Sequence, residues 1–390
     1  MTYARCLGAA SALAIAAGPA LAVDAPVASE AYDFEVETIA EGLVHPWGMV
    51  FLPDDRYLVT ERDLGTIRLG TVEDGLRDEP VLEVEALFAP EGATPRSQSG
   101  IFDLVLHPDF DENGHVYWAY SRETERGAAL VVQRAVWDGD DDSLGDVEDI
   151  WVMAEASQDA SAVHWGGRLL FAPDGSLHLT VGEKFVMNRA QDLEDQAGST
   201  LRMTDTGEVP EDNPEWDEEA DPYLYTAGQR NIQAITVHPG SGAIWAVGHG
   251  PLGGDEINFL VGGQNYGWPL ISGGPDYSGA PIGFGLEHEN MVSPEHVFDE
   301  TVAPSGATFV WEAEGLDAWQ GDLLIGGLVA EGIVRVRFDA DGAVTQEEWI
   351  EIGRRIRDVH VHDGAIWVLT EHEDGELLRL TPGAEAAAGD

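Results

Sequence analysis

The chain has 390 residues and carries 72 acidic against 20 basic side chains, a formal net charge of −52 at pH 7. Nucleic acid and anionic membrane surfaces are not expected as partners, because both are bound through basic faces. Lys184 is the only lysine, and Cys6 is the only cysteine. A charge of this size repels itself at low ionic strength and is screened in brine. It therefore indicates a halophilic or marine source, with an acidic exported protein as the alternative.

The N-terminal residues 1–22 have the pattern of a secretory signal peptide. Arg5 precedes an apolar run from Leu7 to about Ala17, and residues 20–22 (Ala-Leu-Ala) fit a small-residue cleavage site. The run is short for a membrane span, and an N-terminal anchor or a frayed helix is the alternative. Cleavage would place the mature protein in the periplasm or outside the cell, with no membrane span and no thiol for disulfides. Residues 23–35 are expected to be a linker.

A short motif recurs through residues 36–382: an apolar residue, often proline, an Asp/Gly turn, and then a strand. Pro-Asp-Gly supplies tight-turn chemistry, and the runs that follow have the burial or alternation of strands. The copies lie at residues 51–55, 106–109, 171–175, 237–240 and 361–364, with a less regular one at 319–322. Six copies at this spacing predict an all-β fold, a six-bladed β-propeller, with a flexible tail at 383–390. A two-sheet sandwich is the alternative.

Residues 225–268 concentrate residue types that bind ligands. They contain Gly-Gln-Arg-Asn (228–231), His-Gly-Pro-Leu-Gly-Gly-Asp-Glu (249–256) and Asn-Tyr-Gly-Trp (265–268). Glycine and proline let backbone carbonyls approach a ligand, and hard oxygen ligands suit calcium or magnesium. Arg230 has the geometry to hold a carboxylate or phosphate. The segment therefore indicates a site for an anionic organic molecule beside a hard cation, or else a Gly-rich surface loop with solvated acids.

Six motifs, taken in chain order, resemble the soluble quinoprotein sugar dehydrogenases, which use pyrroloquinoline quinone (PQQ). These are the PQQ-dependent glucose, aldose and sorbosone dehydrogenases, and the resemblance runs from about Val36 to Pro382. The motifs are Gln-Ser-Gly (98–100), His-Trp-Gly-Gly-Arg-Leu (164–169), Gly-Gln-Arg-Asn (228–231), His-Gly-Pro with Gly-Asp-Glu (249–256), Ala-Pro-Ser-Gly (303–306) and Arg-Ile-Arg-Asp (355–358).

The resemblance implies the catalytic residues. His164 would be the general base that accepts the proton of the sugar C1 hydroxyl, a role suited to histidine near neutral pH. Glu183 matches a position that is usually aspartate and that orients the base. A structural histidine and a surface Glu–Lys pair are the alternatives from these residues alone.

The resemblance also implies the cofactor contacts. Arg230 and Asn231 would contact the quinone, with Arg230 stabilising negative charge on its carbonyls, and Gln98 would contact the ring system. Arg355 and Arg357, two apart in a predicted strand, would point to one face and hold carboxylates of PQQ, a tricarboxylate. Thr301 would contact the same carboxylates. A lysine that the family often has near residues 326–330 is absent here.

Calcium is the second implied cofactor. The backbone carbonyls of Gly250 and Pro251 match those that hold the Ca²⁺ that polarises the quinone. A second calcium site would use a glutamate where this chain has Gly248, so that site is not expected although Tyr266 is present. Asp255 and Glu256 are expected to stabilise the turn rather than to bind the metal.

These features predict an exported PQQ- and calcium-dependent dehydrogenase that oxidises C1 of an aldose or a related sugar aldehyde. A calcium-dependent lactonase or esterase on a six-bladed propeller is the first alternative, and a non-catalytic binding propeller is the second. The sequence does not identify the sugar, the electron acceptor or the oligomeric state.

Overall fold

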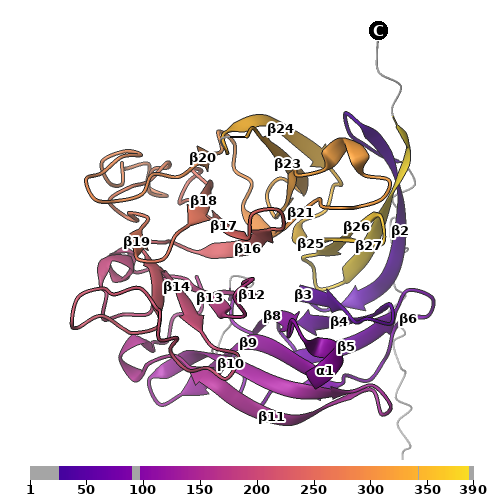
Figure 1. Cartoon of the computed structure of the whole chain (residues 1–390), viewed down its shortest axis with the longest axis horizontal. Helices are drawn as coiled ribbons and strands as arrows, with labels where there is room; N and C mark the ends of the chain where they lie inside the picture. The colour runs from indigo at the N-terminus through magenta and orange to yellow at the C-terminus, as the bar shows by residue number, and fades with distance from the viewer. Residues whose placement is uncertain (1–25, 90–96, 341, 386–390) are drawn as a thin grey trace, which may run out of the picture.

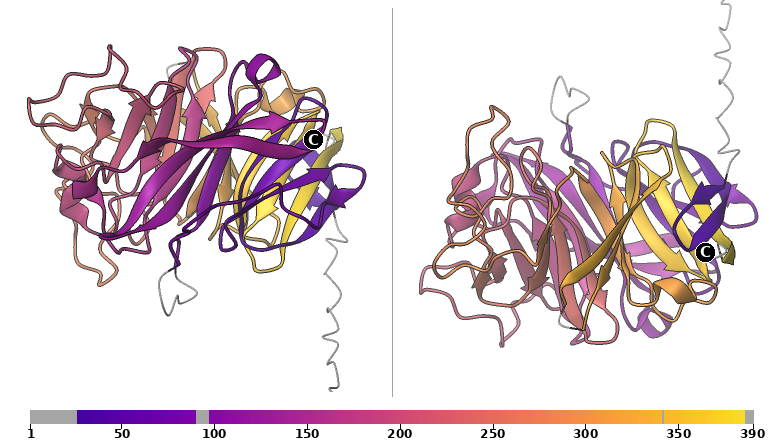
Figure 2. Two further views of the ribbon diagram at one scale, coloured as in Figure 1. Left: turned by 90° about the horizontal axis from the view of Figure 1, so that it is seen from below. Right: turned by 90° about the horizontal axis from the view of Figure 1, so that it is seen from above.

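Six β-sheets stand around a common centre in the computed structural model, which describes residues 26–89, 97–340 and 342–385 (Figure 1). The predicted six-bladed β-propeller is confirmed. Side views show that the sheets form a thick disc with loops on both faces (Figure 2). The signal peptide predicted for residues 1–22 lies outside the described residues. Within residues 26–89, 97–340 and 342–385, every helix is too short or too polar to cross a bilayer.

Each blade is an antiparallel sheet whose first strand lies nearest the centre. Blade 1 contains β3 (Pro46–Phe51), β4 (Arg56–Glu61), β5 (Thr66–Thr71), β6 (Gly75–Leu76) and β7 (Leu82–Glu83). Blade 2 contains β8 (Ile101–Leu106), β9 (His115–Thr124), β10 (Gly127–Asp138) and β11 (Ser143–Val152). Blade 3 contains β12 (Gly166–Phe171), β13 (Leu177–Val181), β14 (Ser199–Met203) and β15 (Leu224–Ala227), with β19 (Gln264–Asn265) added in parallel.

The other three blades follow the same plan. Blade 4 contains β16 (Ile232–His238), β17 (Ala243–Gly248), β18 (Glu256–Leu260) and β20 (His296–Val297). Blade 5 contains β21 (Pro304–Phe309), β22 (Leu323–Gly327), β23 (Gly332–Phe338) and β24 (Val344–Glu351). Blade 6 contains β25 (Ile356–His362), β26 (Ala365–Thr370), β27 (Gly375–Glu385), β2 (Tyr32–Leu43) and β1 (Val27–Ala28). Short helices occur at α1 (Phe110–Asn113), η1 (Glu155–Ser157), η2 (Met187–Gln191) and η3 (Asp317–Trp319).

The two ends of the chain close the ring by sharing blade 6. Strand β2 pairs antiparallel with β27, so the first long strand of the chain completes the last blade. The linker predicted for residues 23–35 instead contains β1 and the start of β2. The flexible tail predicted for residues 383–390 instead begins as strand, because β27 continues to Glu385. Pairing with β2 satisfies the open edge that β27 would otherwise present to solvent.

The innermost strands share a bulge near the end where each begins. Strands β3, β8, β12, β16, β21 and β25 are neighbours in that order around the centre, and β25 contacts β3. Each one shifts register against its second strand within its first residues. A bulge bends the strand and redirects side chains. The residues at and just before these bulges therefore converge on one end of the central channel.

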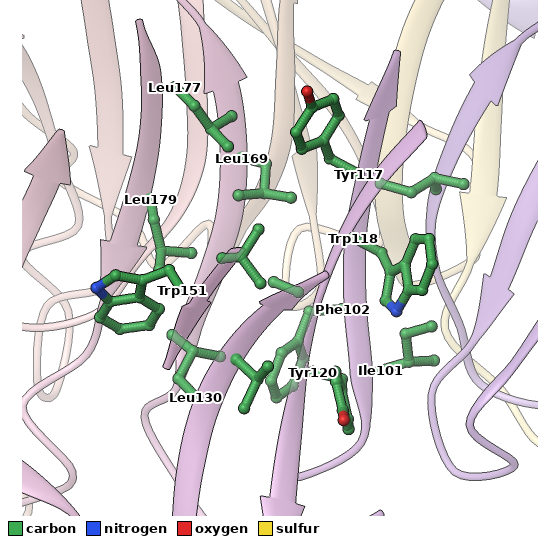
Figure 3. Packing of buried hydrophobic residues seen from close by; sticks show 14 of the residues in the cluster. Ile101, Phe102, Tyr117, Trp118, Tyr120, Leu130, Trp151, Leu169, Leu177 and Leu179 are labelled. Carbon is green, nitrogen blue, oxygen red and sulfur yellow. The ribbon is translucent and has the colours of Figure 1, made fainter. Parts of the chain in front are cut away.

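At the opposite end, aromatic side chains join the blades in pairs. Phe51, at the end of β3, stacks on His362 at 3.9 Å and contacts Trp367 at 5.1 Å. Phe171 contacts His107 at 5.2 Å and Tyr117 at 5.1 Å, and Phe309 contacts His238 at 4.8 Å and Trp245 at 6.3 Å. The three equivalent triads join blade 6 to 1, blade 2 to 3 and blade 4 to 5. Figure 3 shows apolar packing between blades 2 and 3, with Tyr117 beside Leu169 and Leu177.

Candidate active site

A cavity of about 800 Å³ opens where the innermost strands begin. All six blades contribute to its wall, through residues before the inner strands and loops that follow the second strands. The lining residues are His45, Trp47, Arg62, Ser97, Gln98, Val163, His164, Phe185, Arg230, Asn231, Gln233, His249, Tyr277, Leu328, Arg355, Arg357, Glu371 and His372. This set includes six of the ten predicted site residues, so residues far apart in sequence meet here; the six are Gln98, His164, Arg230, Asn231, Arg355 and Arg357.

The structure brings His164 and Glu183 together. His164 lies just before β12, and Glu183 just after β13, and these strands pair with Gly166 opposite Val181. Nδ1 of His164 lies 2.6 Å from Oε2 of Glu183, and both residues are buried. Because an ionised carboxylate can only accept, Nδ1 carries the proton and Nε2 keeps its lone pair. Burial lowers the pKa of His164, while Glu183 opposes that shift, so the imidazole is neutral at neutral pH.

Close backbone packing supports this pair. A Cβ on Gly182 would lie 2.2 Å from the carbonyl oxygen of His164, so only glycine fits between the two residues. His164 itself has φ +51°, a conformation that costs energy in a non-glycine residue and that clusters at functional sites.

Gln98 and Asn231 hold the loop that carries His164. The backbone N–H of His164 donates to Oε1 of Gln98 at 2.8 Å, and that of Gly166 donates to Oδ1 of Asn231 at 3.0 Å. These bonds fix the orientation of both amides, because a backbone N–H needs an acceptor. The NH₂ groups of Gln98 and Asn231 are then the groups available to a ligand in the cavity.

Arg230 is only partly satisfied by the protein. Its Nη1 donates to the carbonyl of His249 at 3.2 Å, and its Nη2 donates to the hydroxyl of Tyr277 at 3.2 Å. Its Nε is enclosed without a partner among the described residues. Tyr277 belongs to the long segment between β19 and β20, in which no ligand-binding motif was predicted.

His249 also has an unsatisfied ring nitrogen. Its Nε2 is enclosed and has no partner among the residues described. Burial, with Arg230 nearby, lowers the pKa of His249 to about 3 and keeps the ring neutral. His249 stands in one of the six motifs, but no role was predicted for it.

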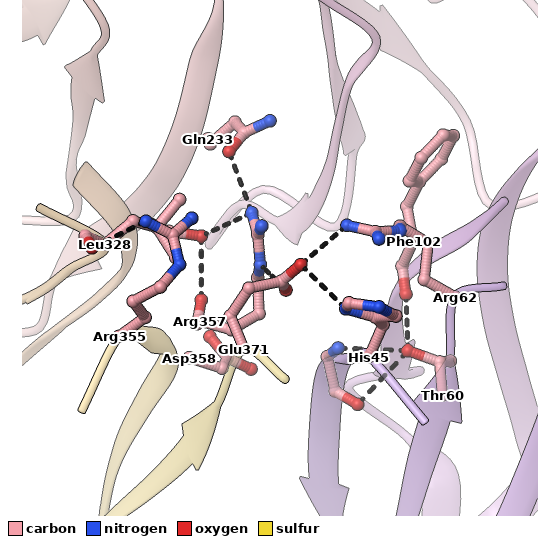
Figure 4. Close-up of polar contacts among 12 residues, drawn as sticks. His45, Thr60, Arg62, Phe102, Gln233, Leu328, Arg355, Arg357, Asp358 and Glu371 are labelled. Atoms are coloured by element: carbon pink, nitrogen blue, oxygen red, sulfur yellow. Dashed lines mark hydrogen bonds and ion pairs between the residues drawn. The ribbon is translucent and has the colours of Figure 1, made fainter. Parts of the chain in front are cut away.

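The two C-terminal arginines differ in their surroundings, although both line the cavity (Figure 4). Arg355 donates to the carbonyl of Leu328 at 2.9 Å. Arg357 is buried and donates to Glu371 at 2.7 Å, to Gln233 at 2.9 Å and to Ser305 at 3.0 Å. Both arginines therefore line the cavity, as their spacing predicted. Arg357, however, already has a carboxylate partner inside the protein.

Glu371 joins three cationic or ionisable groups at the cavity wall. Besides Arg357, it accepts from Arg62 at 2.8 Å and lies 3.3 Å from Nδ1 of His45. Burial opposes ionisation, yet Arg357, His45 and Arg62 hold the pKa of Glu371 well below its usual range. Arg62 and Glu371 were not predicted from the sequence. A usable signal existed, because Thr-Glu-Arg (60–62) and Thr-Glu-His (370–372) stand at the ends of the second strands of blades 1 and 6.

The cavity is strongly basic in a strongly acidic protein. Four arginines (Arg62, Arg230, Arg355 and Arg357) and one carboxylate (Glu371) line it, a formal net charge of +3 when histidine is counted as neutral. The whole chain carries −52. A local field of opposite sign concentrates anionic ligands at this one place on the surface.

The turn after β17 places Gly250 and Pro251 next to the cavity rather than among its lining residues. Asp255 holds this turn, because it accepts from the backbone N–H groups of Gly250 at 2.8 Å, Val302 at 2.9 Å and Ala303 at 2.7 Å. The expectation that Asp255 stabilises the turn is met. Neither carbonyl, of Gly250 or of Pro251, accepts a hydrogen bond from a described residue.

Other candidate metal groups are occupied or dispersed. Glu256 accepts from Asn258 at 3.1 Å, and burial raises its pKa to about 7. The hydroxyl of Tyr266 donates to the carbonyl of Phe259 at 2.6 Å. Across the described part of the chain, no three His, Cys, Asp or Glu side chains gather as a metal site. Thr301 is exposed beside the Gly253 turn and does not line the cavity.

The sequence profile of the Glucose / Sorbosone dehydrogenase family matches residues 43–379. The chain belongs to this family. It is 35% identical over 355 residues to Aldose sugar dehydrogenase YliI of Escherichia coli K12, covering 89% of this chain and 92% of that one. The present chain also resembles solved structures. One is the apo-form of the soluble aldose sugar dehydrogenase from Escherichia coli, with a TM-score of 0.82 and 33% identity over 90% of this chain and 100% of that one. Another is the PQQ-bound aldose sugar dehydrogenase of Streptomyces coelicolor (TM-score 0.70, 25% identity, 91% and 100% coverage).

Proposed function

We propose that this dehydrogenase oxidises C1 of aldose sugars, or of a related sugar aldehyde, with PQQ as the acceptor. The observation that carries the proposal is the cavity itself: a neutral His164 held by Glu183 faces a basic, enclosed space. A sugar hydroxyl needs a base, and a carboxylate-bearing cofactor needs cations. Both are available within one cavity.

The residues present fit PQQ. The cavity's net +3 matches a tricarboxylate, and its volume of about 800 Å³ is within the range of ligand pockets. Arg230 Nε and His249 Nε2 are enclosed polar atoms without partners, which a bound ligand would satisfy. Arg355, Gln98 and Asn231 would add donors. Because Arg357 is bound to Glu371, it would contribute mainly by positioning that carboxylate and by its field.

The turn at residues 250–251 fits calcium in part. Two unused carbonyl oxygens are hard ligands of the right type, but Ca²⁺ takes six to eight oxygens. Gly250 and Pro251 would therefore hold the ion together with oxygens from the cofactor and from water. Asp255 would keep the two carbonyls in place without itself binding the metal.

The chain's own residues then have defined tasks. When bound, PQQ supplies the quinone that accepts hydride from C1. His164 takes the hydroxyl proton on Nε2, and Glu183 stabilises the imidazolium that forms. Arg230 places a guanidinium where negative charge develops. Phe185, in contact with the ring of His164 at 5.0 Å, shields one side of the base from water.

The lactonase alternative receives less support from the site. That chemistry requires carboxylates and amides converging on a metal in the channel, whereas the one carboxylate that lines this cavity, Glu371, is bound to arginines. A binding propeller without catalysis would have no need for the enclosed His164–Glu183 pair.

Reconstitution tests the proposal directly. Purified protein incubated with PQQ and CaCl₂ should reduce an artificial dye with aldoses, whereas the protein alone or with NAD should not. A bound-cofactor absorbance band should appear in parallel, which reports binding without turnover. Activity that persists after dialysis against chelator and that needs no PQQ would contradict the proposal.

We also propose that residues 1–22 direct export to the periplasm or the medium. N-terminal sequencing of the protein from its native source should begin near Val23. A mature protein that retains Met1 would contradict this assignment.

A further inference from the structure

Exposed apolar side chains gather around the mouth of the cavity. We call Leu64, Phe185, Val186, Leu252 and Val329 the apolar rim, and 53–57% of each residue is exposed. They lie on equivalent loops, which connect the second and third strands of blades 1, 3, 4 and 5. Exposed apolar patches on a protein surface commonly mark interaction sites.

Chain connectivity places the rim at the cavity rather than elsewhere on the disc. Leu64 follows Arg62, Leu252 follows His249, and Val329 follows Leu328, and each of those preceding residues lines the cavity. Phe185 lines the cavity itself and lies 6.2 Å from the ring of Tyr277, nearly parallel to it. The rim therefore borders, on blades 1, 3, 4 and 5, the opening through which a partner reaches the site.

Exposed acids alternate with the rim residues. Asp63 precedes Leu64, and Glu331 lies two residues after Val329. Asp299 and Glu300 are also exposed, just before Thr301, which contacts the turn at Gly253 beside Leu252. The surface around the mouth is therefore apolar at the loop tips and negative between them, while the cavity beneath it is positive.

We propose that the apolar rim is the docking surface for a basic one-electron redox protein, the acceptor that reoxidises the enzyme. This inference rests on the proposed function, because it requires electrons to leave through the cavity mouth. For each sugar oxidised, two electrons leave singly to two oxidised acceptor molecules, and two protons go to solvent. The bonds of the acceptor protein do not change.

Charge decides the kind of partner. A second copy of this chain would also carry −52, so association through these faces is opposed by repulsion. A small dye diffuses into the cavity and gains nothing from an apolar ring of this width. A protein with a positive surface around an apolar contact patch matches both features, since opposite charge steers encounter and apolar contact slows dissociation.

The first test compares acceptors that differ only in charge. Holoenzyme with saturating aldose would be mixed with a basic ferric c-type cytochrome, or with the same cytochrome after succinylation of its lysines, and haem reduction followed by absorbance. The native cytochrome should be reduced at least about tenfold faster at low ionic strength, and its rate should fall as salt is added. Equal rates for the two forms, or a rate that rises with salt, would overturn the proposal.

The second test removes apolar contact without changing charge. The variant Val186→Ser/Val329→Ser alters two rim residues that do not line the cavity. The matched control, Val147→Ser/Val152→Ser, alters valines that are 44% and 42% exposed on β11 at the outside of blade 2. The rim variant should reduce the basic cytochrome roughly three- to tenfold more slowly at limiting cytochrome, as expected for two lost apolar contacts.

A neutral small dye serves as the reference acceptor in both tests. Both double variants should reduce the dye at the wild-type rate. If the rim variant and the control reduce cytochrome equally well, the rim is not the docking surface. If wild-type holoenzyme reduces neither dye nor cytochrome, the proposed function itself fails, which separates the two conclusions.

Discussion

Glu183 occupies a position where the resembling dehydrogenases usually have aspartate, and the structure shows how the longer side chain is accommodated. With the extra methylene in place, Oε2 of Glu183 lies 2.6 Å from Nδ1 of His164, so the contact that would orient the base is present. The role of the pair in catalysis remains a prediction.

Replacing Glu183 by glutamine should lower kcat by about 10²- to 10⁴-fold. The amide NH₂ can donate to Nδ1 and so favour the tautomer whose Nε2 is protonated and unable to act as a base. Because Glu183 normally raises the pKa of His164, any residual activity should extend to lower pH. Steady-state kinetics across pH would measure both effects, with Glu194→Gln on the same loop as the control. A wild-type kcat in the Glu183→Gln variant would show that the pair is structural.

Arg355 and Arg357 should respond differently to alanine substitution. The guanidinium of Arg355 donates to one described acceptor, the backbone carbonyl of Leu328, so its loss should weaken PQQ binding about ten- to a hundredfold with little change in unfolding free energy. Loss of Arg357 strips Glu371 of a buried partner and should cost about 3–5 kcal/mol of unfolding free energy.

PQQ titration and urea unfolding of both variants would measure this contrast. Equal loss of stability in the two variants would contradict the assignment of Arg357 as the partner of Glu371. Sequence reasoning treated the two arginines alike because their spacing places both on one face. Only the fold reveals that Glu371, from another loop of the same blade, lies beside one of them.

At the scale of elements, β13 carries a pH-sensitive group far from the cavity. His178 is 1% exposed, and burial, with Arg202 nearby, lowers its pKa to about 3. The unfolded chain protonates this histidine below its ordinary pKa of about 6.5, whereas the folded protein does not. Its contribution to stability is therefore complete above pH 6.5 and is lost as pH falls towards 3.

The variant His178→Gln should remove that pH dependence. Between pH 6.5 and 4.5 the wild type should lose about 1.4 kcal/mol of unfolding free energy per pH unit more than the variant. Urea unfolding at several pH values would compare the slopes, which do not depend on how much the substitution itself destabilises the fold. Parallel slopes would show that His178 titrates normally in the folded protein.

The elements also show where sequence reasoning succeeded and where it stopped. The Pro-Asp-Gly turns predicted the hairpins between first and second strands, because their chemistry is local. The pairing of β2 with β27 could not be predicted in this way, since the paired residues are about 340 positions apart and no local turn joins the two strands. The cavity residues Arg62, Glu371 and His45 were missed because they lie outside the six motifs, although Thr-Glu-Arg and Thr-Glu-His carried a usable signal for two of them.

For the whole molecule, the dominant property is its unbalanced charge. With 72 acids and 20 lysines and arginines, most carboxylates have no cation to pair with, and the cations are largely engaged in ion pairs or in the cavity. Self-repulsion among the remaining acids opposes the compact state. The Debye length, over which charges act on one another, shortens from about 10 Å at 0.1 M salt to about 3 Å at 1 M.

Thermal stability should therefore rise as NaCl or KCl increases from 0.1 M to 1 M. Melting curves in both salts would measure it, and sucrose at matched viscosity provides a control without ions. A melting temperature that falls with added chloride would refute the halophilic interpretation. The net charge could be calculated from composition alone. Only the fold shows that the negative charge lies outside the cavity and that the cavity is lined by arginines.

The three aromatic triads, at the end of the channel opposite the cavity, join the six blades in pairs. Blades 2, 4 and 6 each present a histidine at the end of the inner strand, and blades 3, 5 and 1 each receive it with a phenylalanine. The triads thus group the blades into three two-blade modules, 2–3, 4–5 and 6–1, and the module of blades 6 and 1 combines strands from distant parts of the chain. A circular permutant opened between blades 1 and 2 would keep every module continuous in sequence, whereas the natural termini interrupt one.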